Sequence, residues 1–231
     1  MPVAGLTAKA YAKELVAKID LNRARPAAEI KPGQPQRHES EQTTHYSVID
    51  KDGNAVAVTY TLNFSYGSGI VAAGTGILLN NEMDDFAAKP GTPNAYGLIG
   101  GDANAVGPGK RPLSSMSPTI VLKEGQPVLV TGSPGGSRII TTVLQLVSNV
   151  IDHQMNIAEA TLAPRFHHQW LPDELRIEEG FSPDTVRLLR DLGHKVVVKD
   201  AMGDTQSIVR TTNGLYGFSD SRRSGGLAVG Y

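Results

Sequence analysis

The sequence changes character abruptly between residues 42 and 43, and this change constrains the fold more than any other feature. Pro26, Pro32 and Pro35 interrupt the polar stretch that ends at residue 42, and proline removes a backbone donor that regular structure needs. Two β-rich runs follow at residues 44–50 and 55–62, and the Asp-Gly step between them is typical of a hairpin turn. The sequence therefore predicts an exposed linker that leads directly into a β-hairpin.

The remaining segments alternate between helix-like and strand-like patterns. Apolar residues at i, i+4 and i+8 predict a helix over residues 7–20 with Thr7 as its cap. Residues 89–112 are rich in Gly, Pro and Asn without a period, which is typical of a functional loop or lid. The other expected elements are a buried apolar run at 77–79, strands at 119–123, 127–131, 195–199, 206–210 and 215–219, and helices at 138–153, 156–164 and 182–193. This order predicts an α+β domain in which helices cover antiparallel sheets.

Composition excludes several classes of function. A formal net charge of -1 gives no electrostatic footprint for nucleic acid or a membrane surface. No apolar run is long enough to span a bilayer, and residues 1–6 lack the features of a signal peptide. The absence of cysteine excludes disulfides and a thiol nucleophile. A small-molecule or peptide substrate, with no cofactor, is therefore the expectation.

Thr43 stands at the start of the predicted hairpin. If the backbone were cut between Gln42 and Thr43, Thr43 would carry a free α-amine beside its own hydroxyl. An amine with a pKa of about 7.7 to 8 is well matched to take the proton of a hydroxyl nucleophile. Taken alone, the Gln-Thr-Thr sequence is weak evidence, because threonine-rich strand starts are common.

A glycine-rich stretch, residues 132–137, lies between a predicted strand and a predicted helix. Backbone N–H groups at a helix start are unpaired and carry partial positive charge. The stretch has neither the ending of a P-loop nor the pattern of a nucleophile elbow. An oxyanion hole is the better functional interpretation, and an ordinary tight turn is the structural alternative.

Three acidic residues follow the run at 77–79. Glu82, Asp84 and Asp85 could bind a metal, cap a helix or hold a substrate ammonium group. The cluster contains no histidine and lacks the spacing of a calcium loop, so it makes a poor metal site. A solvated helix start is the structural alternative.

Histidines and serines elsewhere allow a functional and a structural interpretation. Adjacent imidazoles point in different directions, so His167 and His168 are expected to pack or hydrogen-bond rather than share a metal ion. His45 is predicted on the same strand face as Thr43, where it could tune the site. Ser114 and Ser115 are equally suited to binding an anion and to an ordinary loop.

Four long stretches in the same order resemble the small subunit of bacterial γ-glutamyltranspeptidase. The similarity runs from residue 43 to residue 231, and residues 1–42 resemble the C-terminal tail of that family's large subunit. The stretches are Thr43-Thr44-His45-Tyr46-Ser47-Val48, Leu78-Leu79-Asn80-Asn81-Glu82-Met83-Asp84-Asp85-Phe86, Arg111-Pro112-Leu113-Ser114-Ser115-Met116-Ser117-Pro118 and Gly132-Ser133-Pro134-Gly135-Gly136-Ser137.

The resemblance implies an N-terminal nucleophile hydrolase fold, a four-layer αββα sandwich that is incomplete without the large subunit. It implies a precursor that cleaves itself after Gln42. Thr43 would then attack the γ-carbonyl of glutathione or another γ-glutamyl compound, and water or an acceptor amino acid or peptide would resolve the acyl-enzyme. Members of the family are often periplasmic or secreted, and the resemblance implies the same compartment here.

The resemblance also implies roles for individual residues, with two departures from the family. Glu82 is an amide in some members, and the arginine that pairs with the substrate carboxylate comes from the large subunit and is absent from this chain. The implied roles are Thr61 for a hydrogen bond near the nucleophile, Asn63 for the substrate carboxylate, Glu82 and Asp85 for the α-ammonium, Ser114 and Ser115 for the α-carboxylate, Gly135 and Gly136 for the oxyanion hole, and residues 90–101 for a lid gated by Tyr96.

Two alternatives stay open at this point. A related acylase of the cephalosporin or glutaryl type would share the fold, although the two carboxylates Glu82 and Asp85 favour an amino-acid head group. The isolated chain could instead be an inactive fragment that needs a large-subunit partner, because half of the substrate clamp and of the sandwich would be missing.

Overall fold

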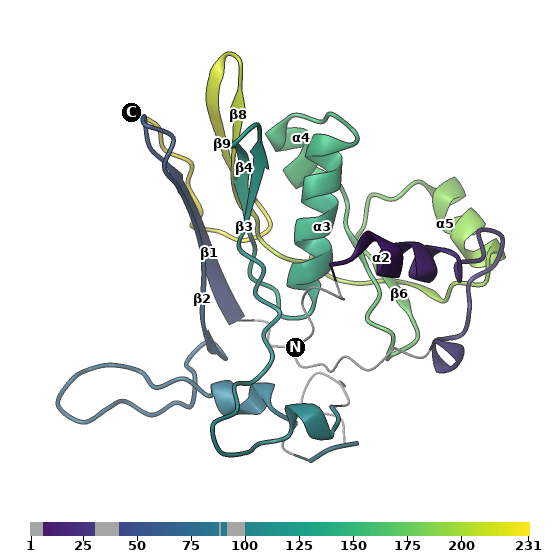
Figure 1. Cartoon of the computed structure of the whole chain (residues 1–231), viewed down its shortest axis with the longest axis horizontal. Coiled ribbons are helices and arrows are strands. Elements are labelled where there is room, and N and C mark those ends of the chain that lie inside the picture. The colour runs from purple at the N-terminus through teal and green to yellow at the C-terminus, as the bar shows by residue number, and fades with distance from the viewer. Residues whose placement is uncertain (1–6, 31–41, 88, 92–99) are drawn as a thin grey trace.

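The computed structural model describes residues 7–30, 42–87, 89–91 and 100–231. Helices and strands alternate along the chain much as the patterns predict (Figure 1). The helices are α2 (Lys9–Val16), α3 (Arg138–Ile151), α4 (Ile157–Leu162) and α5 (Pro183–Asp191), with 3₁₀ turns η1 (Ala27–Glu29), η2 (Glu82–Asp85) and η3 (Asp102–Asn104). The strands are β1 (Gln42–Ile49), β2 (Ala55–Asn63), β3 (Thr119–Lys123), β4 (Gln126–Thr131), β5 (Phe166–His167), β6 (Leu175–Ile177), β7 (Val196–Val198), β8 (Gln206–Thr211) and β9 (Gly214–Ser219).

Most of the described elements stack in three layers (Figure 1). The antiparallel hairpin β1-β2 stacks on one face of a four-stranded antiparallel sheet with the order β3-β4-β8-β9. Helices α3 and α4 cover the other face of that sheet. A third sheet, β5-β6-β7, lies to the side and includes the parallel pair β6-β7. The described residues thus form an α-β-β arrangement, which is three of the four layers of the predicted sandwich.

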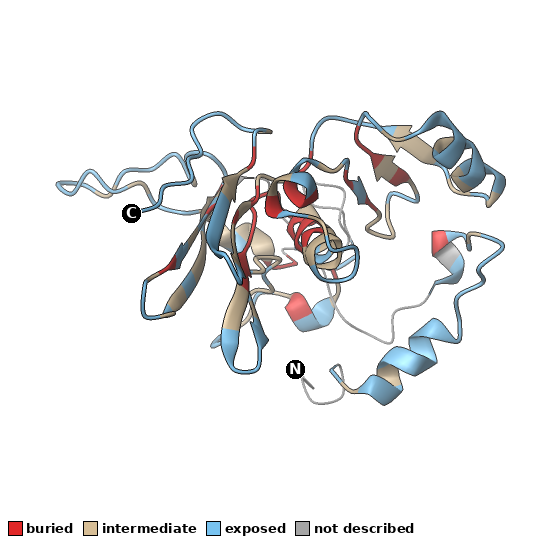
Figure 2. Ribbon diagram, turned by 90° about the horizontal axis from the view of Figure 1, so that it is seen from above, coloured by how far each residue is buried: buried red, intermediate tan, exposed pale blue. Residues whose placement is uncertain are grey.

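The core lies between α3, α4 and the four-stranded sheet, where the buried residues gather in Figure 2. Leu129 of β4 packs with Leu146 of α3 and with Ile157 and Ala160 of α4. Helix α3 presents one apolar face because its buried residues recur at helical spacing. Burial of this face gives the sheet a rigid support on the side away from β1.

The two faces of β1 differ sharply in burial. Thr43, His45 and Ser47 alternate with exposed residues and face the four-stranded sheet. The opposite face of the hairpin carries large exposed apolar side chains, among them Tyr46 and Val48. A soluble domain rarely leaves such a sheet face uncovered. The exposed face therefore marks where the fourth layer of the sandwich belongs.

A buried group of four charges links the C-terminal strands to the third sheet. The guanidinium of Arg165 donates to Asp220 at 2.6 Å, and that of Arg222 donates to Glu178 at 2.7 Å. The backbone N–H of Met202 donates to the second oxygen of Glu178 at 2.6 Å. Buried charges persist only when paired and hydrogen-bonded. This group holds residues 202–205 in place beside the glycine-rich stretch.

The N-terminal segment packs on the loop that precedes β6. Indole Nε1 of Trp170 donates to the carbonyl of Ala27 at 2.6 Å, and the N–H of Ala27 donates to Asp173 at 2.8 Å. The expected division into residues 1–42 and residues 43–231 stays a prediction.

Two local expectations differ from the structure. The helix predicted over residues 7–20 is the eight-residue α2, which buries no residue and has Ala8, not Thr7, at its N-cap position. Few tertiary contacts support its ends. The run at 77–79 is not buried, since Ile77 is 62% and Leu79 is 44% exposed. An apolar run is buried only where another segment covers it, and here only Leu78, which bridges to Val71, is half-buried.

Other local expectations are confirmed. The capping box at the start of α4 is complete, because Asn156 accepts the N–H of Glu159 and Glu159 accepts that of Asn156. Both hairpins and the strands near 206–211 and 214–219 form as predicted. The short strands β5 and β6 had no sequence signal, because strands of two or three residues show no periodicity.

Candidate active site

The register of the β1-β2 hairpin places Thr43 directly opposite Thr61. Gln42 pairs with Asn63, so the register shifts between Gln42 and Thr43 and leaves one extra residue on β2. Such a bulge bends the strand and re-aims side chains. The predicted nucleophile and its predicted hydrogen-bonding partner are thus neighbours at the end of the hairpin.

Asn63 is fixed at this bulge. It is fully buried and has a positive φ of 73°, which asparagine tolerates better than most residues. Its N–H donates to Oγ1 of Thr61 at 2.9 Å, and its Nδ2 donates to the carbonyl of Asn81 at 3.1 Å. Asn63 therefore joins the hairpin end to the segment that leads into η2.

The 3₁₀ turn η2 holds the acidic cluster. Burial raises the pKa of Asp85 to about 8, and a hydrogen bond and the charge of Glu82 add to this effect. Oε1 of Glu82 is buried without a hydrogen-bond partner among the described residues. Two carboxyl groups that resist joint ionisation are stabilised by a cation placed between them. The pair is therefore suited to an ammonium group.

A metal is a weaker interpretation of this cluster. Within the described ranges, no group of three histidine or acidic side chains is arranged to hold an ion.

The two adjacent histidines have separate partners. His167 is buried and bonds to Thr141 at 2.8 Å and to Gln169 at 2.9 Å, while His168 pairs with Asp173. The packing interpretation of the two adjacent histidines is confirmed.

Ser114 and Ser115 lie on an extended segment that Asn104 ties to η2. Nδ2 of Asn104 donates to the carbonyl of Asp85 at 2.7 Å, and its Oδ1 accepts the N–H of Leu113 at 3.1 Å. Sequence reasoning missed Asn104, because it lies in a stretch without a pattern. The structure thus connects the predicted ammonium-binding and carboxylate-binding segments through one side chain.

The glycine-rich stretch turns from β4 into α3. Gly135 and Gly136 are buried and have positive φ values of 135° and 61°. Ser133 accepts the N–H of Asp204 through its hydroxyl at 2.8 Å. Among the described residues, no carbonyl accepts a hydrogen bond from the N–H of either Gly135 or Gly136. Two free amides at a helix start fit the geometry of an oxyanion hole.

His45 brings this stretch close to Thr43. Its ring lies over Gly132, where an added Cβ would come within 2.3 Å of the ring. Ser47 donates its hydroxyl proton to the carbonyl of Gln206 at 2.8 Å, so it must accept from Nε2 of His45 at 3.1 Å. Nδ1 then accepts from Thr59 at 2.8 Å. Burial lowers the pKa of His45 to about 4, so the ring is neutral near pH 7.

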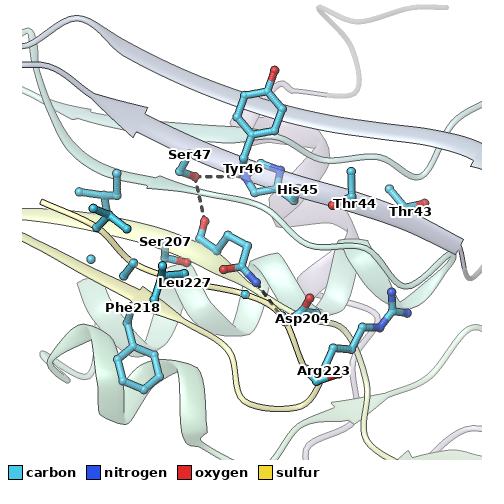
Figure 3. A pocket seen from close by; sticks show the side chains of 18 residues that line it. Thr43, Thr44, His45, Tyr46, Ser47, Asp204, Ser207, Phe218, Arg223 and Leu227 are labelled. Carbon is cyan, nitrogen blue, oxygen red and sulfur yellow. Dashed lines mark hydrogen bonds between the residues drawn. The ribbon is translucent and has the colours of Figure 1, made fainter.

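A cleft of about 450 Å³ runs along the edge of β1 that does not pair with β2 (Figure 3). Thr43 and Thr44 line it on one side, and Asp204 and Arg223 line it on the other. Burial is the main cause that raises the pKa of Asp204. The cleft gives access to Thr43 from the side opposite Asn63.

Two predicted features fall partly or wholly outside the described residues. Tyr96 and most of the predicted lid, residues 92–99, are among those not described. Gln42 is described only through its backbone in β1. None of the helices in the described part of the chain has the length and hydropathy to cross a membrane.

Comparisons with known proteins agree with this architecture. A family model for gamma-glutamyltranspeptidase matches residues 1–230. The glutathione hydrolase proenzyme of Escherichia coli (strain K12) is 68% identical over 232 residues, which is 100% of this chain and 40% of that protein. The corresponding proenzyme of Pseudomonas aeruginosa is 45% identical and is covered over 41% of its length. The chain thus spans about two fifths of the length of these relatives.

Solved structures of two related enzymes are similar to this chain in fold. A mutant of Helicobacter pylori gamma-glutamyltranspeptidase is similar with a TM-score of 0.75 and 62% identity, over 78% of this chain and 100% of that chain. Cephalosporin acylase from Bacillus halodurans is similar with a TM-score of 0.81 and 29% identity, over 99% of this chain and 39% of that chain.

The stacked sheets and these neighbours define an N-terminal nucleophile hydrolase fold. Within that class, the chain belongs to the gamma-glutamyltranspeptidase family.

Proposed function

We propose that this chain is the catalytic part of an enzyme that transfers or hydrolyses γ-glutamyl groups of glutathione and related amides. The observation that carries the proposal is the position of Thr43, which lies opposite Thr61 and on the face that His45 links to the glycine-rich stretch. A nucleophile, a cation-binding acid pair and two free backbone amides are needed for this chemistry, and all three come from adjoining segments.

The reaction would begin after scission of the bond between Gln42 and Thr43. The freed α-amine of Thr43 takes the proton of Oγ1, which attacks the γ-carbonyl carbon of the substrate. The N–H groups of Gly135 and Gly136 stabilise the oxyanion that forms. Collapse breaks the amide bond, the amine of Thr43 returns the proton to the leaving nitrogen, and an acyl-enzyme remains. Water or the amine of an acceptor amino acid or peptide then releases the γ-glutamyl group.

The head group of the substrate would be held at both charged ends. Glu82 and Asp85 would bind the α-ammonium, which explains why two carboxyl groups lie together at a partly buried turn. Ser114, Ser115 and Asn63 would donate to the α-carboxylate. Tyr96 would gate the lid over residues 90–101, in keeping with the resemblance.

A large-subunit partner is part of the proposal. The exposed apolar face of β1-β2, the exposed run at 77–79 and the missing fourth layer support a second polypeptide segment that covers them. Residues 1–42 would be the C-terminal tail of that subunit, joined to Thr43 until scission. By resemblance, the partner would add an arginine for the substrate carboxylate, and the enzyme would work in the periplasm or outside the cell.

Self-cleavage tests the mechanism directly. In the precursor that contains both parts, mass spectrometry should find a chain beginning at Thr43. Thr43→Ala should leave the precursor intact and inactive, because it removes the nucleophile for both steps. Thr185→Ala is the matched control, since Thr185 is an exposed threonine on α5, away from the cleft, and it should still cleave. An intact precursor with full activity would contradict the mechanism.

The choice of substrate separates this proposal from an acylase. The similarity to cephalosporin acylase makes that comparison necessary. The assembled enzyme should hydrolyse γ-glutamyl-anilide faster than glutaryl-anilide, because only the former offers an ammonium to Glu82 and Asp85. A preference for glutaryl-anilide would overturn the assignment. If the chain were as active alone as with its partner, the need for a large subunit would be refuted.

A further inference from the structure

Asn104 is a buried polar residue to which the proposed mechanism assigns no role. It ends the 3₁₀ turn η3, and the residue is only 6% exposed. Both ends of its amide are used, because Nδ2 donates to the carbonyl of Asp85 and Oδ1 accepts the N–H of Leu113. Its own carbonyl accepts the N–H of Ala87 at 2.9 Å. One residue therefore fastens together two segments that are distant in sequence.

The two fastened segments carry the two halves of the proposed head-group site. Asp85 is a member of the acid pair, and Leu113 immediately precedes Ser114 and Ser115. An α-amino acid presents its ammonium and its carboxylate on one carbon, so both halves must stand at a fixed spacing to bind it. A neutral amide is suited to this task, since it donates in one direction and accepts in the other without adding a charge.

We propose that Asn104 is a positioning residue that sets the spacing between the acid pair and the serine pair, and thereby selects an α-amino acid head group. This inference rests on the proposed function. Loss of either hydrogen bond would leave a half-buried backbone group of Asp85 or Leu113 unsatisfied, so these segments would move to find water. Contacts to both charged groups of one substrate could then no longer form together.

The chemical step should be affected far less than binding. Neither hydrogen bond of Asn104 goes to the hairpin that carries Thr43 or to the glycine-rich stretch. The Asn104→Ala variant should therefore weaken the binding of γ-glutamyl substrates and leave kcat nearly unchanged. Because glutaryl compounds lack the ammonium, their KM should rise less, and the preference for γ-glutamyl should shrink.

The experiment uses the assembled enzyme, with Asn104→Ala, the volume-matched Asn104→Leu and the control Asn149→Ala. Asn149 also donates its Nδ2 to a backbone carbonyl, that of Ala160, but in the helical layer. KM and kcat are measured for γ-glutamyl-anilide and glutaryl-anilide, and the Kd of L-glutamate is measured by calorimetry. Self-cleavage, followed by mass spectrometry, reports on folding independently of substrate binding.

Both Asn104 variants should self-cleave, raise the KM for γ-glutamyl-anilide and the Kd of glutamate about tenfold, and change kcat by less than about threefold. Asn149→Ala should behave like the wild type in both assays. Unchanged Kd and KM, an equal rise in KM for both anilides, or loss of self-cleavage in both variants would overturn the inference. A wild type that binds glutamate without hydrolysing either anilide would instead refute the proposed function, and the Kd values would still decide the role of Asn104.

Discussion

At the scale of single residues, His45 is held in one protonation state by its neighbours. The hydroxyl of Ser47 is committed to the carbonyl of Gln206, so Nε2 of His45 must carry the proton and Nδ1 must accept. A protonated ring could not accept from Thr59, and no charged side chain contributes to the lowered pKa. The residue beside the proposed nucleophile is therefore a neutral connector between two sheets.

This state makes stability depend on pH. The folded pKa of His45 is about 4, against an ordinary value of 6.5. Below pH 6.5 the unfolded chain binds a proton that the folded chain does not, so the free energy of unfolding falls as pH drops from 6.5 towards 4. The loss should reach roughly 3 kcal/mol near pH 4, and about 2 kcal/mol of it should appear between pH 7 and pH 5. Urea unfolding of the assembled enzyme at pH 7 and pH 5 measures this second difference.

The variant His45→Gln gives the control, because glutamine hydrogen-bonds without titrating. The loss of unfolding free energy between pH 7 and pH 5 should be smaller in His45→Gln than in the wild type. The difference should equal the loss that the titration of His45 alone causes. An identical pH dependence in both proteins would show that His45 does not titrate as its burial implies.

At the scale of elements, the contact between β1 and the glycine-rich stretch decides the geometry of the site. Gly132 has no side chain, which lets the imidazole of His45 lie directly over its backbone. The two sheets can therefore approach closely next to Thr43. On the outer face of the hairpin, large side chains such as Tyr46 and Val48 are exposed instead.

Gly132→Ala should separate these elements. An added Cβ would come within 2.3 Å of the ring of His45, and the hydrogen bonds of that ring to Thr59 and Ser47 oppose its movement. We expect a loss of roughly 1–3 kcal/mol in the free energy of unfolding, as for other overpacked sites, together with slower self-cleavage. Gly230→Ala is the control, since nothing lies within 4 Å of its added Cβ. Equal stability and cleavage in both variants would refute the close contact.

At the scale of the whole molecule, the described chain is a sandwich with one outer layer uncovered. Helices α3 and α4 protect one sheet, while the outer face of β1-β2 presents Tyr46, Val48 and Tyr60 to solvent. The relatives are about two and a half times as long as this chain. Their additional length is sufficient to supply the missing layer.

A charge on this face should block assembly. Val48 is 48% exposed on the outer face of β1, so Val48→Lys is tolerated by the chain itself but would be buried without a partner charge beneath a covering layer. We expect association with a separately made large subunit to weaken at least about tenfold in a pull-down or titration. Val198→Lys, at a similarly exposed position of β7, should not weaken it. Equal association of both variants would place the partner elsewhere.

Local patterns predicted much of this protein. The Asp-Gly hairpin, the capping box at Asn156 and the apolar face of α3 follow from interactions within a few residues, and each formed where expected. The motifs around Thr43, Glu82 and Gly135 indicated the family, which the comparisons confirm.

Tertiary structure alone decided which of these local features meet. The bulge that sets Thr43 opposite Thr61, the bridge made by Asn104 and the place of His45 over Gly132 join residues far apart in the chain. Periodicity and capping carry no information about such pairs, because packing between layers selects them. For the same reason the run at 77–79, apolar in sequence, is exposed here. Whether an apolar side chain is buried depends on what covers it, and its own sequence does not encode that cover.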